Sequence, residues 1–382
     1  MPRGQRFKLR EEATASSLFF MRLPFPQRLA RLRALLQASE LDACVTLHRP
    51  NILYLCGFSG SSGALLVEPR GARLFTDNRY AIQAAEEVHS ASVGIVQGSL
   101  LAAVGDRLQQ SGTRLRRVGY EASRLSVLQL KQLRTAAGVR VRWQPAVSLV
   151  EGLRAVKDRG EIVLMKAAAA LGSQAFEQVL PLIKPGIREF ELAAEIEYRM
   201  RRMGAIGPAF ETIVAFGERS ALPHARPSGR RLRKNELVVL DLGAILQHYC
   251  CDLTRTVYIG RAPARIRGWY QAVLEAQSAA RHALRAGVTG SQVDEAARDV
   301  LRKHRLDRFF THSTGHGLGL EVHEDPRLAA GQTQKLQTSN VVTLEPGVYV
   351  QGVGGIRIED DAVVTPGEAQ ILTTAQRGLL EL

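Results

Sequence analysis

The chain has 382 residues, of which 45% are hydrophobic and 23% are charged, which is the balance of a globular protein. No apolar run reaches the ~20 residues that a membrane-spanning helix needs, so we expect no membrane span. The net charge is +14, but the basic residues are mostly dispersed among Asp and Glu, whereas a nucleic-acid surface clusters them with aromatic residues. We therefore expect no nucleic-acid partner and no membrane partner, and the length predicts two domains.

Residues 1–20 form a basic segment that differs from a signal peptide. The apolar stretch SLFFM is shorter than a signal-peptide core, and no small-residue cleavage site follows it. We expect a disordered basic extension over residues 1–20, which makes Met21 a candidate for the biological start.

The cysteines indicate the redox environment. The chain has four: Cys44, Cys56, Cys250 and Cys251. Their spacing matches neither a disulfide framework nor a zinc ribbon, and two of them, Cys44 and Cys56, fall in predicted strands. Free, buried thiols in a reducing compartment are therefore expected, which favours a cytoplasmic location.

Residues 25–145 alternate predicted helices and strands. First come an amphipathic helix, PQRLARLRALLQASE, a strand, DACVTL, and two strands around a Pro-Arg-Gly turn, GALLVEP and ARLFTD. Three helices follow, NRYAIQAAEEV, LAAVGDRLQQ and LSVLQLKQLRTA, with the strands RRVGYE and VRVRW between or after them. This alternation predicts an α/β domain over residues 21–150 that ends in a strand and hinge, VRWQPAVSLV.

From about residue 155 the chain changes to two helices followed by strands, and this pattern occurs twice. The first helix pair is RGEIVLMKAAAALGSQAFEQVLPLI with REFELAAEIEYRMRRMG, and the second is ARIRGWYQAVLEAQSAARHALRAG with GSQVDEAARDVLRKH. A faint repeat at an offset of 101 residues aligns the segments that begin at Ile183 and Leu284. The whole chain is thus predicted to be α+β, with a helix-helix-sheet repeat over residues 151–382.

Residues 238–260, VVLDLGAILQHYCCDLTRTVYIG, contain two strands that each carry a buried aspartate. Strands disfavour Asp, and an unpaired buried carboxylate costs several kcal/mol or becomes protonated. A hairpin centred between Leu246 and Gln247 would place Asp241 directly opposite Asp252, with Cβ atoms ~4.5–5.5 Å apart. One or two divalent ions would relieve the repulsion. A partly exposed sheet face with solvated carboxylates is the alternative that this segment alone leaves open.

A second hairpin, VVTLEPGVYVQGVGGIRIEDD, has the same design. Glu345 and Glu359 are equidistant from Gly352 in a glycine-rich turn, so they too are expected to lie opposite each other. Between the hairpins lies THSTGHGLGLEVHE, which contains His316 and His323. Two Asp, two Glu and a His predict a hydrolytic site that holds two ions ~3.5–4 Å apart. Such oxygen-rich sites suit Mn²⁺, Co²⁺ or Fe²⁺ better than structural zinc.

Five segments resemble, in order, the pita-bread metallopeptidases, the family of aminopeptidase P, prolidase, methionine aminopeptidase and the metal-free creatinase. They are ALPHARPS, VVLDLGA with YCCDLTRT, STGHGLGLEVHE, TLEPGVY and GIRIEDD. The segments NILYLCGFSGSSGALLV and LFTDNRY resemble the creatinase/prolidase N-terminal domain, and LRAVKDRGEIVLMKAA resembles the family's linker and first helix. The resemblance covers roughly residues 25–380. It implies a creatinase/prolidase-like domain followed by a pita-bread catalytic domain with pseudo-twofold repeats.

The resemblance also implies a ligand set in which every position is intact. The ligands would be Asp241, Asp252, His316, Glu345 and Glu359. Asp241 would chelate one ion, Asp252 and Glu359 would bridge two, and His316 would be the single imidazole ligand. Glu345 would in addition accept a proton from the attacking water.

Three further residues receive roles from the same resemblance. His224 and His323 would hold the substrate carbonyl and stabilise the oxyanion, and Arg357 would orient a ligand carboxylate. We interpret His304 and His312 as structural.

The N-terminal domain favours the proline-specific branch, because methionine aminopeptidases generally lack it. Proline has no N–H and a fixed φ, so a substrate with proline at its second position needs a shaped pocket. We expect a metallopeptidase with two divalent ions, Mn²⁺ preferred and Co²⁺, Fe²⁺ or Zn²⁺ as alternatives, that cleaves Xaa-Pro peptides or dipeptides. The resemblance implies a homodimer. A methionine aminopeptidase-like enzyme and a non-catalytic pita-bread binding protein remain as alternatives.

Overall fold

The computed structural model describes residues 23–112 and 114–382, so the expected extension over residues 1–20 and the candidate start Met21 lie outside the described residues. The chain divides into two compact units, residues 23–154 and residues 155–382, here called the N-terminal and C-terminal units. Among the described residues, no helix is both long and apolar enough to cross a bilayer.

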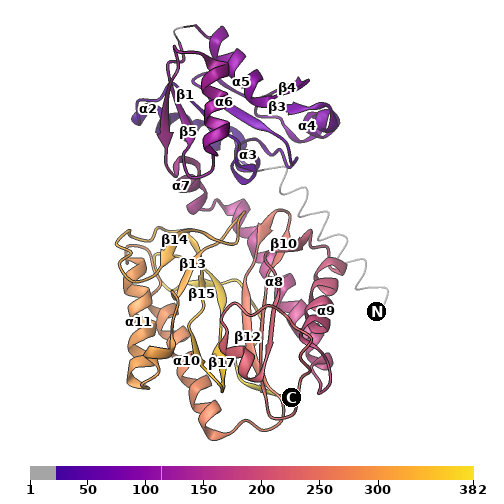
Figure 1. Cartoon of the computed structure of the whole chain (residues 1–382). Helices are drawn as coiled ribbons and strands as arrows, with labels where there is room; N and C mark the ends of the chain where they lie inside the picture. The colour runs from indigo at the N-terminus through magenta and orange to yellow at the C-terminus, as the bar shows by residue number, and fades with distance from the viewer. Residues whose placement is uncertain (1–22, 113) are drawn as a thin grey trace. The chain divides into compact units, whose positions relative to one another are not determined.

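The N-terminal unit is built on a six-stranded sheet with the strand order β4-β3-β2-β1-β5-β6 (Figure 1). Its strands are β1 (Ala43–Thr46), β2 (Ala64–Glu68), β3 (Gly71–Asp77), β4 (Ser92–Val96), β5 (Arg117–Glu121) and β6 (Arg142–Ala146). Its helices are α2 (Phe25–Ala38), α3 (Arg49–Cys56), α4 (Ala81–Glu87), α5 (Leu100–Gln110), α6 (Val127–Ala137) and α7 (Leu149–Ala155). Strands β2 and β3 form the hairpin expected around the Pro-Arg-Gly turn.

The sequence interpretation was wrong in three places in this unit. Strand β4 was missed, and β6 begins three residues later than VRVRW, although it lies within VRWQPAVSLV, the segment expected to contain the last strand and hinge. Cys56 ends helix α3 rather than lying in a strand. Every residue from Asn51 to Cys56 is buried, and a helix that is buried on all sides has no amphipathic period by which it could be identified. The expectation of free, buried thiols is confirmed for all four cysteines.

In the C-terminal unit, two helix pairs enclose the strands (Figure 1). The first pair is α8 (Arg159–Val179) with α9 (Glu189–Arg202), and the second is α10 (Ala264–Ala283) with α11 (Gly290–Lys303). Helices α9 and α11 begin, and also end, 101 residues apart, which is the offset of the faint repeat. The predicted helix-helix-sheet repeat and the α+β fold class are confirmed.

Two larger sheets hold most strands of this unit, and apart from β20 each sheet is built from one half of the repeat. The first has the order β20-β12-β9-β8 and the second has the order β14-β13-β15-β18-β19. Their strands are β8 (Ile213–Phe216), β9 (Leu237–Leu242), β12 (Leu253–Tyr258), β20 (Leu380–Glu381), β13 (Gly315–Gly317), β14 (Glu324–Leu328), β15 (Val341–Leu344), β18 (Asp360–Val363) and β19 (Gln370–Ile371). Shorter ladders join β7 (Gly207–Pro208), β10 (Ala244–Leu246) and β11 (Tyr249–Cys250), and also β16 (Gly347–Val350) with β17 (Gly354–Arg357).

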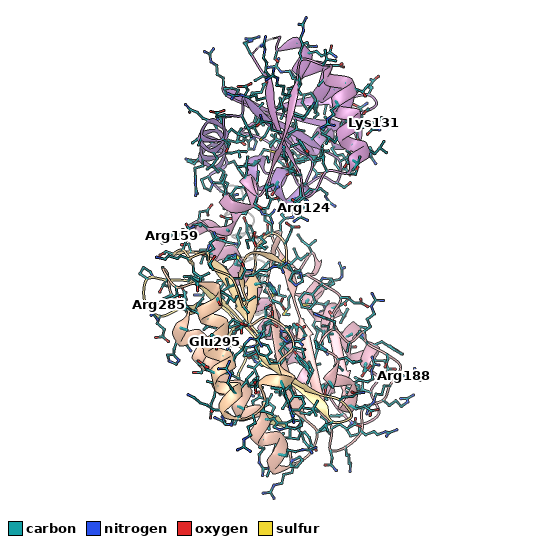
Figure 2. All side chains as sticks on the ribbon, turned by 60° about the vertical axis from the view of Figure 1, so that its left-hand side comes forward. Arg124, Lys131, Arg159, Arg188, Arg285 and Glu295 are labelled. Atoms are coloured by element: carbon teal, nitrogen blue, oxygen red, sulfur yellow. The ribbon has the colours of Figure 1, made fainter. Side chains whose placement is uncertain are left out.

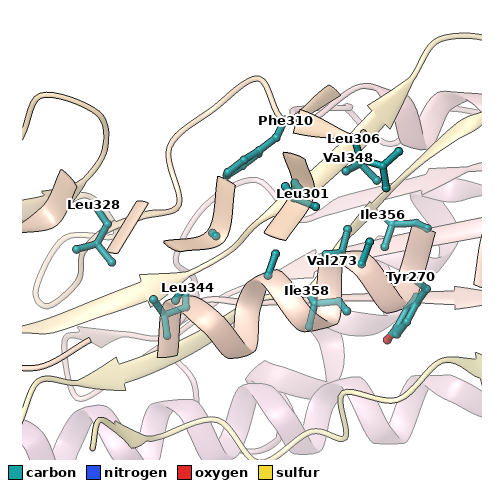
Figure 3. Packing of buried hydrophobic residues seen from close by; sticks show 14 of the residues in the cluster. Tyr270, Val273, Leu301, Leu306, Phe310, Leu328, Leu344, Val348, Ile356 and Ile358 are labelled. Carbon is teal, nitrogen blue, oxygen red and sulfur yellow. The ribbon is translucent and has the colours of Figure 1, made fainter. Parts of the chain in front are cut away.

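The core of the second half fixes the backbone of the acidic residues. Fully buried side chains from α10, α11 and β15–β17 pack together there, among them Val273, Leu301, Leu344 and Ile358 (Figure 3). Leu344 directly precedes Glu345 and Ile358 directly precedes Glu359. Each glutamate is thus attached to a residue that the core holds in place, since interiors of this kind are close-packed.

The register of the first hairpin differs from the expected one. Asp241 pairs with Thr254, and the turn that closes β10 and β11 is centred between Gln247 and His248. Both turn residues have positive φ, +48° and +69°, as a two-residue turn of type I′ requires. Asp252 is therefore level with Gly243 rather than with Asp241. The error amounts to two residues of register, so both aspartates remain on one face of the ladder.

The register of the second hairpin is as expected. Leu344 pairs with Asp360 and Gly347 pairs with Arg357, so Glu345 and Glu359 are level with each other. They lie at the point where the ladder changes from β15–β18 to β16–β17.

The charged residues labelled in Figure 2 come from well-separated parts of the chain. They are Arg124, Lys131, Arg159, Arg188, Arg285 and Glu295. No two of them belong to the same helix, which agrees with basic residues that are dispersed along the sequence.

Candidate metal centre

Four of the five predicted ligands come together in the C-terminal unit. Single side-chain atoms of Asp252, His316 and Glu359 all lie within 4.8 Å of one another. The Nε2 atom of His316 is 3.8 Å from Oδ2 of Asp252 and 3.4 Å from Oε1 of Glu345. These residues come from both hairpins and from β13 between them, so the fold brings together predicted ligands that are far apart in the sequence. We call the four residues together with Asp241 the acidic cluster.

Asp241, the fifth predicted ligand, lies in the buried strand β9. Its Oδ2 accepts a hydrogen bond of 2.5 Å from Nη2 of Arg357, while its Oδ1 is buried and has no hydrogen-bond partner among the described residues. The Oδ1 atom of Asp252 is likewise buried and has no hydrogen-bond partner among the described residues. A buried carboxylate oxygen without a donor is costly, and both oxygens offer a lone pair to a cation.

The electrostatics of the acidic cluster also favour a cation. Burial, followed by the charge of Glu359, raises the pKa of Asp252 well above its usual value. Burial, followed by the charge of Glu345, does the same to the pKa of Glu359. Burial raises the pKa of Glu345 to about 7. Carboxylates that are short of solvent and repel one another are charged at neutral pH only when a positive ion compensates them, so these residues fit a metal centre.

The strand that carries His316 is held close to its neighbours by glycines. A Cβ atom on Gly315 would lie 2.0 Å from the carbonyl oxygen of Thr343, and one on Gly317 would lie 2.3 Å from that of Asp325. Neither position therefore admits a side chain. Nδ1 of His316 lies 3.0 Å from the carbonyl oxygen of Gly317, which can only accept, so Nδ1 carries the proton. Nε2 then directs its lone pair at the carboxylates, which is the usual arrangement of an imidazole ligand.

Arg357 connects the two hairpins beneath the acidic cluster. Besides its bond to Asp241, its Nε donates to Oγ1 of Thr254 over 3.0 Å, and Thr254 in turn donates to Oε2 of Glu359 over 2.5 Å. Its Nη1 donates to the carbonyl oxygen of Pro223 over 3.2 Å. One buried guanidinium thus orients a carboxylate of each hairpin and also holds the loop that precedes His224.

The two histidines outside the predicted ligand set, His224 and His323, lie near the acidic cluster. The ring of His323 contacts the ring of His316 edge to face, with centroids 4.4 Å apart. Burial, then the charges of Arg327 and His224, lower the pKa of His323. The electrostatic influence of His224 on His323 shows that the loop after Pro223 approaches the same site.

The sequence interpretation missed a pair of residues at the site. Nε2 of His312 accepts from the hydroxyl of Tyr349 over 2.8 Å, and that hydroxyl accepts from Nη1 of Arg357 over 2.7 Å. Nδ1 of His312 lies 3.9 Å from Oε2 of Glu345, so His312 is close to the cluster. The sequence carries no local signal of this contact, because it joins residues 37 positions apart. His304, in contrast, pairs with the exposed Glu275 over 3.0 Å.

Comparison with known proteins supports the assignment of the whole chain. Residues 163–366 match the model of metallopeptidase family M24, and residues 28–156 match that of the creatinase/prolidase N-terminal domain. The first of these matches covers more than half of the chain. The chain belongs to metallopeptidase family M24. It is a pita-bread metallopeptidase with an N-terminal creatinase/prolidase domain.

Similar proteins are named for both kinds of proline peptidase. The chain is 32% identical to the Xaa-Pro dipeptidase of Pyrococcus horikoshii over 93% of its own length and 99% of the relative's. The structure of an Xaa-Pro dipeptidase from Bacillus anthracis superposes with a TM-score of 0.90 at 34% identity, covering 93% of this chain and 99% of that one. An X-Pro aminopeptidase from Thermotoga maritima gives a TM-score of 0.85 at 36% identity, covering 90% of this metallopeptidase and 98% of that chain.

Proposed function

We propose that this metallopeptidase uses two divalent ions to hydrolyse the bond between an N-terminal residue and a following proline. The observation that carries the proposal is the meeting of Asp252, His316 and Glu359 within 4.8 Å, with Glu345 3.4 Å from His316. The names of relatives similar over nine-tenths of the chain support the choice of an Xaa-Pro substrate.

The acidic cluster supplies enough oxygen ligands for two ions. Asp252 and Glu359 would be shared by both, Asp241 and Glu345 would each bind one, and His316 would add the imidazole. When bound, such ions polarise a carbonyl group and lower the pKa of water towards neutrality. The predominance of carboxylates favours Mn²⁺, with Co²⁺, Fe²⁺ or Zn²⁺ as alternatives.

Glu345 is the residue we assign to proton transfer. In the metal-free protein its pKa is about 7, and bound ions would lower it, so that its carboxylate would be ionised and able to accept a proton at neutral pH. Its side chain is 15% exposed, whereas those of Asp241 and Asp252 are 10% and 7% exposed. Of these three carboxylates it is thus the most accessible to water.

His224 and His323 would donate hydrogen bonds to the substrate carbonyl. Both are exposed, whereas the residues of the acidic cluster are buried or half-buried, so His224 and His323 are accessible to a substrate that enters from solvent. A donor that is fixed in place stabilises the negative charge that develops on the carbonyl oxygen during hydrolysis.

Peptides with and without proline test the proposal. With Mn²⁺ supplied, we expect cleavage of Ala-Pro at a kcat/KM at least ~10²-fold above that of Ala-Ala. The amide N–H of Ala-Ala would lose water at a cost of ~1–3 kcal/mol, and a partly empty proline pocket would lose roughly 1–3 kcal/mol more. Equal rates on the two dipeptides would remove the proline pocket from the proposal. Fastest cleavage of Met-Ala peptides would instead indicate a methionine aminopeptidase-like enzyme.

A second comparison separates the two proline activities. An aminopeptidase P-like enzyme would cleave Ala-Pro-Ala as well as Ala-Pro, whereas a prolidase-like enzyme would cleave only the dipeptide. The relatives carry both names, so this measurement decides between them.

The remaining parts of the proposal concern the surroundings of the enzyme. The four buried, free thiols favour a reducing, cytoplasmic compartment. The homodimer is carried over from the family resemblance, and sedimentation of the full-length chain tests it.

A further inference from the structure

We propose that a buried ion pair between Lys157 and Glu324 positions His323 for its work on the substrate. The proposal rests on the role given above to His323. Nζ of Lys157 lies 3.1 Å from Oε2 of Glu324, and the two side chains are only 1% and 6% exposed. The pair lies outside the acidic cluster, and nothing in the proposed chemistry uses it directly.

Glu324 holds the loop that ends at its neighbour His323. Its Oε1 accepts from the backbone N–H of Glu321 over 3.1 Å, so the carboxylate folds back beneath the loop. A Cβ atom on Gly319 would lie 2.7 Å from Oε2 of Glu324, which shows how closely the loop lies on the carboxylate. The carbonyl oxygen of Gly319 accepts from the N–H of Cys250 over 2.8 Å, and this bond fixes the start of the loop.

Lys157 presents its ammonium group from a fixed segment of backbone. Its N–H donates to the carbonyl oxygen of Ser339 over 2.9 Å, and Val156 forms an isolated bridge with Asn340. The Asn340 side chain donates to the carbonyl oxygen of Ala155 over 2.8 Å. Residues 155–157 are thereby bonded to the segment that enters β15, the strand that leads to Glu345.

The energetics favour a positioning role over simple stabilisation. Two charges that are removed from water lose much of their hydration, so a buried ion pair is rarely more stable than an apolar pair of the same volume. Removing one partner, however, takes away the opposite charge that compensates the buried charge of the other. Glu324 without Lys157 would move towards water. Because Glu324 follows His323 directly and bonds to Glu321, that movement would displace the imidazole.

The test combines changes at Lys157 with the loss of His323. K157M is expected to lower kcat on Ala-Pro by about 10- to 100-fold, by analogy with residues that orient metal ligands, with KM and metal content little changed. In the H323A background, K157M should produce no further loss, because the group that it positions is already absent. A loss in the double variant equal to the product of the two single losses would overturn the proposal.

Two controls keep the test decisive. E324Q retains the acceptor for the N–H of Glu321 but weakens the ion pair, so it should reproduce the kcat effect of K157M even if K157M folds poorly. R230M removes an ion pair elsewhere in the same unit, Arg230 with Glu236 at 2.6 Å, and should leave kcat unchanged. Full activity of H323A would instead refute the proposed role of His323, an outcome distinct from additive losses.

Histidine NMR of the zinc-loaded, full-length protein gives a readout that does not depend on activity. The imidazole signal of His323, assigned by its absence in H323A, should shift in K157M and in E324Q. The signal of the surface residue His304 should not shift. An unchanged His323 signal in both variants would contradict the proposal.

Discussion

The two acidic hairpins of the C-terminal unit show how one repeated framework carries two different pairs of carboxylates. In the first hairpin the ladder changes from β9–β12 to β10–β11; Asp241 lies within β9, whereas Asp252 lies at the change, so the two are staggered by two residues of register. In the second hairpin the ladder is interrupted between β15–β18 and β16–β17, and Glu345 and Glu359 are level at the interruption.

The difference follows from side-chain length and charge. Two level residues have Cβ atoms only ~4.5–5.5 Å apart, and the longer glutamate side chains allow their carboxylates to diverge from there. Aspartate is one methylene shorter, so its carboxylate stays close to the strand, and a stagger keeps the two apart on one face. Arg357 in the second hairpin bonds to Asp241 in the first. The two halves therefore form one site rather than two equivalent ones.

Removal of one charge from each hairpin tests whether the two halves are equally necessary. We expect D252N and E359Q each to lower kcat/KM on Ala-Pro by about 10³-fold or more. Bound ions contribute several kcal/mol of charge stabilisation to the transition state, each ~1.4 kcal/mol is tenfold in rate, and the loss of a shared ligand would weaken both ions. Metal content, measured by plasma mass spectrometry, should fall well below two ions per chain in both variants. Either variant with two tightly bound ions and nearly full activity would show that its residue is not shared.

The histidines extend the comparison to substrate binding, with His224 from the first half of the unit and His323 from the second. H224A and H323A should each lower kcat by about 10²-fold, the usual loss when an oxyanion donor is removed. The metal content should stay near two ions per chain. H304A, which removes a surface histidine, is the matched control and should be fully active. Stoichiometric loss of metal in either test variant would place that histidine among the ligands.

The comparison also shows which features of the fold and site could be predicted from sequence. Both acidic pairs were identified because carboxylates inside apolar strands are rare. The second register could be predicted because the glycine-rich turn around Gly352 marks its centre. The first could not, because Gln247 and His248 form a turn that usually contains Asn and Gly. The predicted centre was therefore one residue too early.

Other features depend on contacts that local sequence does not report. His312 lies in a loop and is connected to the acidic cluster through Tyr349 of strand β16. A histidine in a loop does not reveal such a contact in the sequence. The pair of Lys157 and Glu324 joins residues 167 positions apart. Single charged residues in polar segments are usually solvated, so the sequence did not indicate that Lys157 and Glu324 would be buried.

Arg357 provides a test of the link between the hairpins, with a smaller expected effect. R357K keeps the positive charge but cannot donate to Asp241, Thr254 and Tyr349 at once, because Lys lacks the planar fork of Arg. We expect metal affinity about tenfold weaker, at the lower end of the usual 10–100-fold loss for residues that orient a ligand. Isothermal titration of the metal-free protein with Mn²⁺ measures this affinity. Unchanged affinity would mean that each hairpin holds its carboxylates without the other.

The smallest expected effect is a dependence of stability on pH in the metal-free protein. In the folded protein the pKa of Glu345 is raised to about 7, and those of Asp252 and Glu359 are also raised. At pH values above the pKa of ordinary carboxyl groups, the folded state therefore binds more protons than the unfolded state. Stability then falls as the pH rises through the folded pKa. His312 and His316 have pKa values lowered to about 4, which acts in the opposite direction, but only below the unfolded histidine pKa of ~6.5.

The window from pH 6.5 to pH 8 therefore isolates the carboxylates. For each proton that the folded state binds in excess of the unfolded state, one pH unit changes the free energy of unfolding by about 1.4 kcal/mol. The metal-free protein should therefore lose on the order of 1 kcal/mol of stability across this window. Urea unfolding at the two pH values measures the loss. E345Q, which has no group titrating near pH 7 at that position, should show a smaller fall, and Mn²⁺ should abolish the fall in the unmodified chain. If the metal-free protein instead became more stable from pH 6.5 to pH 8, the protein itself, most directly Arg357, would already compensate the repulsion within the acidic cluster. The cluster would then have no electrostatic need for a second positive ion.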